Sequence, residues 1–141
     1  MNIIILHGPN LNLIGSLSAQ LEKRTTLDKI NRDIRRKVRN QDIQLKIEQT
    51  HKVFQAINFI QRNRNWADAI IFAPMAWARY EYAIGDALKF AHVKTTQVLF
   101  TEGFGDLSES DSIYSSIVDT TLMGEPDQVY LDALDSIIKT A

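Results

Sequence analysis

Apolar residues are arranged along the chain in short continuous runs, separated by longer stretches with helical spacing. Asn2–Leu6 (NIIIL) and Ala69–Phe72 (AIIF) are rich in β-branched residues, which is typical of strands covered on both faces of a sheet. Ile43–Gln49 alternates apolar and polar residues, so we expect an edge strand or a strand with one solvated face. Two further strands are predicted, at Thr95–Thr101 and, from a weaker pattern, at Ile117–Leu122.

Stretches with helical spacing lie between and after these strands. The first helix is expected to begin after Thr25 or Thr26, because either hydroxyl can cap it. Its apolar positions are Leu27, Ile30, Ile34 and Val38. Further helices are predicted at Lys52–Arg62, Ala78–Ala91 and Asp127–Ile138. On the middle one of these, the candidates for the packed face are Tyr82, Ala83, Leu88 and Ala91.

Alternation of strands and helices predicts a parallel sheet with helices on both faces. We expect a single domain over residues 1–141, built as a flavodoxin-like three-layer α/β sandwich with a five-stranded parallel sheet of order 2-1-3-4-5. Ligands of such sheets bind beyond the carboxyl ends of the strands. The segments expected to meet there are His7–Asn12, Gln49–His51, Ala73–Ala78 and Thr101–Asp106.

Composition narrows the class of protein. The formal net charge is −1 and the pI is about 6.3, which argues against a nucleic-acid partner. The basic residues between Lys29 and Arg39 are interpreted as a helix face exposed to solvent. The chain has no Cys and three His, so no metal site is expected. No apolar run reaches the roughly 18 residues of a membrane span, and we expect no signal peptide. These features favour a cytoplasmic protein.

One motif is more specific than the rest. GPNLNLIG (Gly8–Gly15), followed by TTL at Thr25–Leu27, resembles the opening of type II 3-dehydroquinate dehydratases. Phe72–Leu88 (FAPMAWARYEYAIGDAL) takes the place of that family's NPGAYTHTSVALRDAL, and VYLDAL (Val129–Leu134) matches its terminal helix. The resemblance covers nearly the whole chain. It implies a cofactor-free, flavodoxin-like shikimate-pathway enzyme that assembles as a homotrimer or a homododecamer.

The family's reaction is a trans elimination of water through an enolate. A lid tyrosine flanked by arginines acts as base, a histidine acts as acid, and an asparagine with ordered water stabilises the enolate. By resemblance, Asn10 matches this asparagine, and Asp86 matches an acid that contacts the site of a neighbouring subunit. The other positions carry different residues: Glu22 for the lid tyrosine, Leu17 for a lid arginine, Ala73 for an asparagine, Arg79 for the histidine, Gln97 and Leu99 for a Glu and a His, and Asp106 for an arginine.

These replacements remove positive charge where the family binds an anionic substrate. Leu17 and Asp106 each stand for an arginine, and Arg79 is the one new cation. An anionic substrate in the family's pose would meet an unfavourable potential. The hypothesis is that dehydration of 3-dehydroquinate is altered or lost.

Two versions of the function stay open. In one, the chain is a lyase on 3-dehydroquinate or a related substrate with a changed acid–base set; in the other, it is a non-catalytic paralogue that binds a small polar or carboxylated ligand or acts as a scaffold. The candidate catalytic residues are Asn10, Glu22 and Arg79. The candidate ligand-binding residues are His7, Asn12, His51, Asp86, Phe100 and Thr101.

Most of these residues also have a purely structural interpretation. His7 and His51 can be ligand contacts or acid–base groups, or can be histidines held by hydrogen bonds. A lid carboxylate such as Glu22 can abstract a proton if its pKa is raised, but it can equally be a solvated side chain. Asn10 and Asn12 can tie the turn through hydrogen bonds to the backbone.

The lid segment and the aromatic residues complete the predictions. Ser16–Arg24 contains no Gly, Pro or Tyr, so we expect an ordered helix rather than a mobile flap. Trp66 is expected to pack against a neighbouring strand. Trp77, with Met75, Tyr80 and Tyr82, is interpreted first as part of an oligomer interface and second as a stacking surface for a ligand. A scaffold would have its cleft plugged by Trp77, Leu17 or Leu99.

Overall fold

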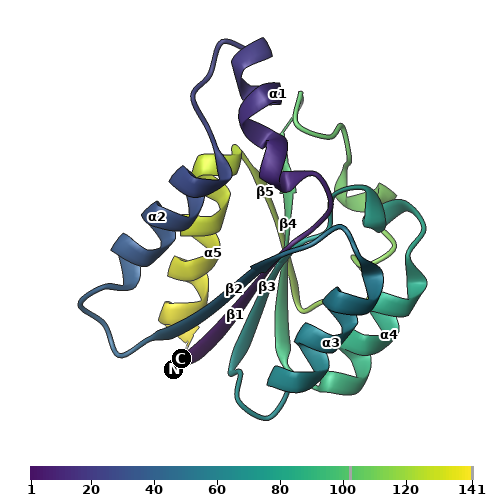
Figure 1. Cartoon of the computed structure of the whole chain (residues 1–141). Helices are drawn as coiled ribbons and strands as arrows, with labels where there is room; N and C mark the ends of the chain where they lie inside the picture. Colours follow the sequence, from purple (N-terminus) through teal and green to yellow (C-terminus); the bar gives the residue numbers. More distant parts are fainter. Residues whose placement is uncertain (102, 141) are drawn as a thin grey trace.

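Five parallel strands form the middle layer of the structure, in the order β2-β1-β3-β4-β5 (Figure 1). The computed structural model describes residues 1–101 and 103–140. The order confirms the flavodoxin-like sandwich expected from the sequence, and in register Ile5 of the first strand lies beside Ile47 and Ile71. The strands are β1 (Asn2–His7), β2 (Gln44–Gln49), β3 (Ala69–Ala73), β4 (Lys94–Phe100) and β5 (Thr120–Gly124).

Helices cover both faces of this sheet. Figure 1 shows α2 (Leu27–Val38) and α5 (Pro126–Thr140) on one face, and α3 (Val53–Asn63) and α4 (Tyr82–Ala91) on the other. The short helix α1 (Ile14–Gln20) stands beyond the carboxyl ends of the strands. Short 3₁₀ helices are η1 (Leu11–Leu13), η2 (Met75–Arg79) and η3 (Glu109–Asp111). None of the helices in the described part of the chain is long and apolar enough to cross a membrane.

The first strand shows why its sequence is a continuous apolar run. Successive side chains of a strand point to opposite faces. Ile3 and Ile5 pack in one core cluster with α2 and α5, and Ile4 and Leu6 pack in a second cluster with α3 and α4. All four side chains are fully buried. Both faces of β1 are therefore covered, as the run of β-branched residues predicts.

The segment after the first loop confirms the predicted helix only in part, because α1 includes Ser16–Gln20, whereas Leu21–Arg24 is not helical. Thr26 is the cap of α2, and its hydroxyl accepts a hydrogen bond from the Lys29 amide at 3.1 Å. The Ser18 hydroxyl of α1 accepts a hydrogen bond from the Thr25 amide at 2.8 Å. Lys23 forms an ion pair with Glu125 at 2.8 Å. Because Glu125 directly precedes α5, this pair joins the end of the lid segment to the start of that helix.

One predicted helix is shorter than its pattern suggested. The sequence predicted a helix over Ala78–Ala91 with Tyr82 and Ala83 packed, but η2 precedes α4, and the helix begins only at Tyr82. Because of this break, a different side of the helix faces the sheet from the one that the sequence pattern predicted. Tyr82 and Ala83 are exposed, whereas Leu88 and Ala91 are buried as expected. The prediction was wrong for the first turn because it continued one helical period across the break.

Candidate functional site

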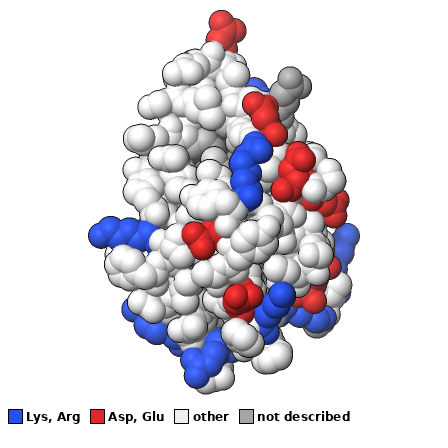
Figure 2. Space-filling view, turned by 90° about the vertical axis from the view of Figure 1, so that its right-hand side faces the viewer, with Lys and Arg blue, Asp and Glu red and all other residues white. Residues whose placement is uncertain are grey.

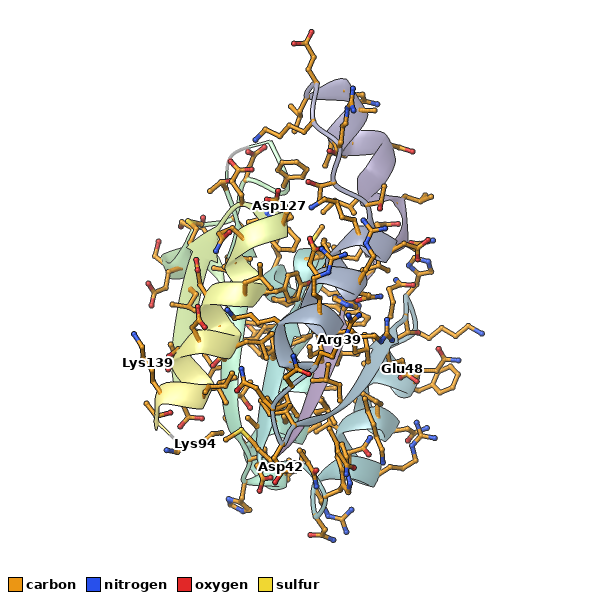
Figure 3. All side chains as sticks on the ribbon, turned by 90° about the vertical axis from the view of Figure 1, so that its left-hand side faces the viewer. Arg39, Asp42, Glu48, Lys94, Asp127 and Lys139 are labelled. Atoms are coloured by element: carbon orange, nitrogen blue, oxygen red, sulfur yellow. The ribbon has the colours of Figure 1, made fainter. Side chains whose placement is uncertain are left out.

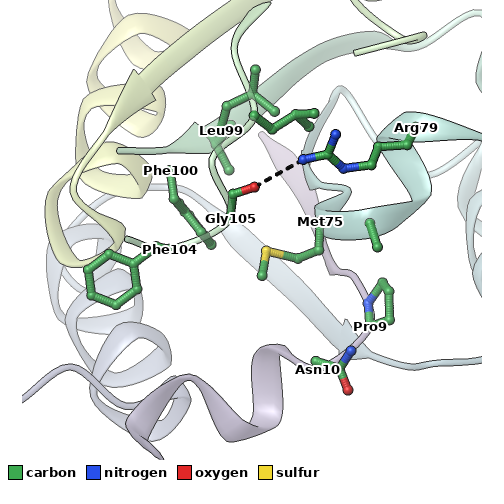
Figure 4. A pocket seen from close by; sticks show the side chains of 11 residues that line it. Pro9, Asn10, Met75, Arg79, Leu99, Phe100, Phe104 and Gly105 are labelled. Carbon is green, nitrogen blue, oxygen red and sulfur yellow. Dashed lines mark hydrogen bonds between the residues drawn. The ribbon is translucent and has the colours of Figure 1, made fainter. Parts of the chain in front are cut away.

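A cavity of about 180 Å³ lies at the carboxyl-end edge of the sheet (Figure 4). It is built by the turn after β1, the 3₁₀ helix after β3, the end of β4 and the loop that follows β4. The first two of these contribute Pro9, Asn10, Met75, Ala76 and Arg79. The last two contribute Val98, Leu99, Phe100, Phe104, Gly105 and Leu107.

The cavity has an apolar floor and a polar rim. The floor consists of side chains that are almost completely buried, such as Leu99, Phe100 and Phe104. The polar side chains, Asn10 and Arg79, belong to exposed residues at the opening. A ligand that fits this arrangement has one charged or polar end and an apolar body.

Arg79 supplies the positive charge of the rim. Figure 4 shows its guanidinium group reaching across the cavity, where Nη2 donates a hydrogen bond to the Gly105 carbonyl oxygen at 3.4 Å. This bond is longer than a typical N–H···O bond, and a guanidinium group carries five N–H donors. No carboxylate of the described residues forms an ion pair with Arg79. The group therefore retains the donors that a bidentate carboxylate contact requires.

A carboxyl group lies within the electrostatic reach of Arg79. Hydrogen bonds from the Ser108 side chain and backbone lower the pKa of Asp111, and the charge of Arg79 lowers it further. The Ser108 hydroxyl donates to Asp111 at 2.7 Å, which fixes this carboxylate in the capping box of η3. The negative charge of Asp111 thus reduces the positive electrostatic potential around Arg79, although the two side chains do not form an ion pair.

The turn that carries Asn10 is held from several sides. Asn10 adopts a left-handed conformation with φ of 68°, and its amide donates a hydrogen bond to His51 Nδ1 at 3.0 Å. Gly8 precedes it because the chain approaches Pro74 closely there, where a Cβ atom would lie 2.6 Å from the Pro74 carbonyl oxygen. The Gln49 side chain donates to the Gly8 carbonyl oxygen at 3.1 Å. His51 and Gln49 therefore position Asn10 on the rim.

His7 lies outside the cavity, inside the core. Its Nδ1 and Nε2 lie 2.8 Å from the Tyr130 hydroxyl and from Asn31 Oδ1, respectively. Because Asn31 Oδ1 only accepts, Nε2 carries the proton, and Nδ1 accepts from Tyr130. Burial is the main reason that the pKa of His7 falls to about 4, with the charge of Arg35 adding to the effect and the Asn31 hydrogen bond opposing it. This geometry favours the structural interpretation of His7.

The cavity brings together some of the residues predicted from the sequence. It unites Asn10, Arg79 and Phe100, with His51 bonded to Asn10. The remaining predicted site residues do not line it. Glu22 is exposed just after α1, Asp86 is exposed on α4, and Asn12 is exposed in η1 beside a separate hollow. The amide of Thr101 donates a hydrogen bond to the Gly124 carbonyl oxygen at 3.1 Å. The described residues contain no group of three His, Cys, Asp or Glu side chains that could hold a metal ion.

The aromatic residues near η2 divide into two groups. Trp77 was expected at an interface or against a ligand, but it is 1% exposed and packs in the second core cluster, with its ring 6.4 Å from that of Phe72. The expectation was wrong because the 3₁₀ helix turns this side chain inward. Tyr80 and Tyr82 are exposed. Trp66 packs beside β2 as predicted, with Lys46 Nζ 4.2 Å from its ring centroid.

The cleft is not plugged in the way a scaffold would require. Leu99 forms part of the floor and leaves the cavity open. Trp77 and Leu17 pack in the two core clusters and do not line it.

Sequence reasoning considered Met75 only as part of an interface or a stacking surface and did not single out Phe104, although both line the cavity. Met75 has a positive φ of 53° and stands where the resembling motif NPGAYTHTS has its glycine, so the signal was present in the comparison of the two motifs. Phe104 is 1% exposed although its loop is rich in Gly, Ser and acidic residues. The presence of a single aromatic residue in a loop of this composition was the feature of the sequence that could have identified Phe104.

A flavodoxin-like sheet with a cavity beyond its strand ends is typical of the class of α/β proteins that bind a ligand at this edge. Within this class the chain belongs to the type II dehydroquinase family, because the sequence model described as "Dehydroquinase class II" matches residues 1–138. The chain is 35% identical over 103 residues to the 3-dehydroquinate dehydratase of Caldanaerobacter subterraneus subsp. tengcongensis, a match that covers 73% of this chain and 70% of that protein. It is 39% identical over 88 residues to that of Dictyoglomus turgidum, which covers 62% of this chain and 61% of the relative.

Solved structures agree with this assignment. The type II dehydroquinase from Butyrivibrio crossotus superposes with a TM-score of 0.85 at 25% identity, over 97% of both chains. The type II dehydroquinase from Propionibacterium acnes has the same fold, with a TM-score of 0.80 at 23% identity over 96% of both chains.

Proposed function

We propose that this member of the family binds a small carboxylate in the strand-end cavity and dehydrates 3-dehydroquinate far more slowly than an ordinary 3-dehydroquinate dehydratase, or not at all. The observation that carries the proposal is the chemistry of the lining. Among its described residues the only ionisable side chain is Arg79, and none is His, Tyr, Asp or Glu. Elimination of water needs a base and an acid, and a guanidinium group stays protonated throughout.

A lyase with a changed base is the competing version, and Glu22 is its candidate. Glu22 is exposed at the end of α1 and does not line the cavity. The segment around it is held in place: Lys23 pairs with Glu125 at 2.8 Å, and Leu21 lies against Gly103. Because a general base must come within hydrogen-bond reach of the proton it removes, this placement favours ligand binding over proton abstraction.

The test is a dehydratase assay on the purified protein, in which the conjugated enone product of 3-dehydroquinate is followed by ultraviolet absorbance. We expect a rate at least about 10³-fold below that of an ordinary family enzyme assayed alongside, since a missing base and a missing acid each cost about 10²–10⁴-fold. Asn10→Ala serves as the control for contaminating host enzyme, because a contaminant's activity does not respond to it. An ordinary turnover rate that falls in Asn10→Ala would overturn the proposal.

A further inference from the structure

We propose that the cavity selects carboxylates with an apolar ring, such as benzoate or cyclohexene carboxylate, over polyhydroxylated ones such as quinate, and that Met75 is a specificity-determining residue. The inference rests on the proposed carboxylate binding and names the class of ligand that this site takes.

The size and lining of the cavity support a ring. Its volume of about 180 Å³ exceeds the roughly 150 Å³ of an apolar protein cavity that is known to admit benzene. Apart from Asn10, Arg79 and Gly105, every described residue that lines it is apolar. Hydroxyl groups on a ligand ring would lose their water against Leu99 and Phe104 and find no side-chain partner there. A hydroxylated ring is therefore disfavoured relative to a bare one.

Arg79 determines which end of the ligand faces the opening. Figure 4 shows the side chains of Arg79 and Met75 both pointing across the cavity toward the loop that carries Phe104 and Gly105. The guanidinium group lies at the exposed rim, and the thioether lies over the apolar floor. A carboxylate placed on Arg79 thus puts the attached ring against Met75 and the floor.

The backbone at Met75 points to the same role. A φ of 53° is uncommon for any residue other than Gly, Asn or Asp and costs conformational energy. Glycine at this position would adopt the same backbone without strain and leave the space of the side chain empty. Here the strained position carries a polarizable apolar side chain directed into the cavity, where it is suited to an aromatic or alicyclic ring.

The experiment is calorimetric titration of the purified chain with four probes: benzoate, cyclohex-1-ene carboxylate, quinate and uncharged benzyl alcohol. We expect the two ring carboxylates to bind at least about tenfold more tightly than quinate, and benzyl alcohol to bind weakest. Arg79→Gln should weaken benzoate binding at least about tenfold. Arg39→Gln, at the far end of α2 (Figure 3), is the matched control and should change nothing.

Two variants test Met75 without disturbing its backbone, because Asn and Gly both accept a positive φ. Met75→Asn and Met75→Gly should each reduce the preference for benzoate over quinate at least about fivefold, with unchanged circular dichroism. If either folded variant keeps the full preference, the role of Met75 is wrong. If quinate binds the parent protein as tightly as benzoate and depends on Arg79, the inference fails while the proposed carboxylate site stands. If none of the carboxylates binds, both fail.

Discussion

At the scale of single residues, His7 shows how a polar side chain can belong to the core. Both ring nitrogens are hydrogen-bonded, and burial keeps the ring neutral with a pKa of about 4. In the unfolded chain the pKa returns to about 6.5, so the unfolded state takes up a proton first as the pH falls. The contribution of His7 to stability is fully present above pH 6.5 and is lost between pH 6.5 and pH 4.

We therefore predict that the free energy of unfolding falls by about 3 kcal/mol from pH 7 to pH 4 through His7 alone, as 1.36 kcal/mol accompanies each pKa unit. Urea unfolding at a series of pH values measures this slope. His7→Gln should be less stable at pH 7 but show a shallower slope. His92→Asn, at the exposed end of α4, should keep the parent slope. Equal slopes for the parent and His7→Gln would contradict the assignment.

Asp106 is a second residue whose charge can be tested separately from its structural role. Its Oδ1 accepts a hydrogen bond from the Gly103 amide at 3.2 Å, and its φ is 49°, both of which Asn reproduces. Since Asp106 follows Gly105 in the cavity wall, Asp106→Asn should strengthen benzoate binding about two- to threefold at low salt. The gain should shrink in 1 M salt. Asp132→Asn on α5 is the control, and an unchanged affinity in Asp106→Asn at low salt would speak against the charge argument.

The candidate site was only partly predictable at this scale. The sequence identifies Asn10 and Arg79 through the motif and the strand ends, and the cavity contains both. It could not separate His7 from the cavity, because a histidine at a strand end points either to the edge or to a covering helix. Here the pleat directs it toward Asn31 of α2 and Tyr130 of α5. That direction depends on tertiary packing, which one sequence does not contain.

At the scale of elements, α2 illustrates a local signal that decides a boundary. The Thr26 hydroxyl accepts from the Lys29 amide at 3.1 Å and satisfies a donor that the helix leaves open. Thr26→Ala should lower the free energy of unfolding by about 1 kcal/mol, and Thr26→Ser should lower it by much less. Chemical unfolding at pH 7 measures both. Equal stability of Thr26→Ala and the parent would show that the cap contributes nothing.

The strands and α2 were predictable because their patterns follow local rules. The apolar run of β1 and the alternation of β2 each record how many faces of the strand are covered. The start of α4 was not predictable, since the 3₁₀ helix η2 depends on how the chain packs after Pro74. Helical periodicity continues across such a break in sequence, although the backbone does not.

At the scale of the whole molecule, one side of α4 exposes two large aromatic side chains. Tyr82, Asp86 and Phe90 are spaced four residues apart and therefore share one side of α4, where Tyr82 and Phe90 are 68% and 76% exposed. Figure 2 views the side of the molecule that carries α3 and α4, and shows broad uncharged areas between scattered acidic and basic groups. Exposed aromatic residues are enriched in protein interfaces. We propose that this side of α4 joins copies of the chain.

The prediction is a homotrimer or a homododecamer, detected by light scattering coupled to size exclusion as a multiple of the 16.1 kDa chain mass. Tyr82→Asp combined with Phe90→Asp should shift the mass toward the monomer, because two buried carboxylates would lose their hydration without gaining a partner. Lys139→Asp, near the end of α5 on the opposite side (Figure 3), is the control that should leave the mass unchanged. A monomeric parent protein would refute the assembly, whereas an oligomer that survives the double substitution would place its interface elsewhere than on α4.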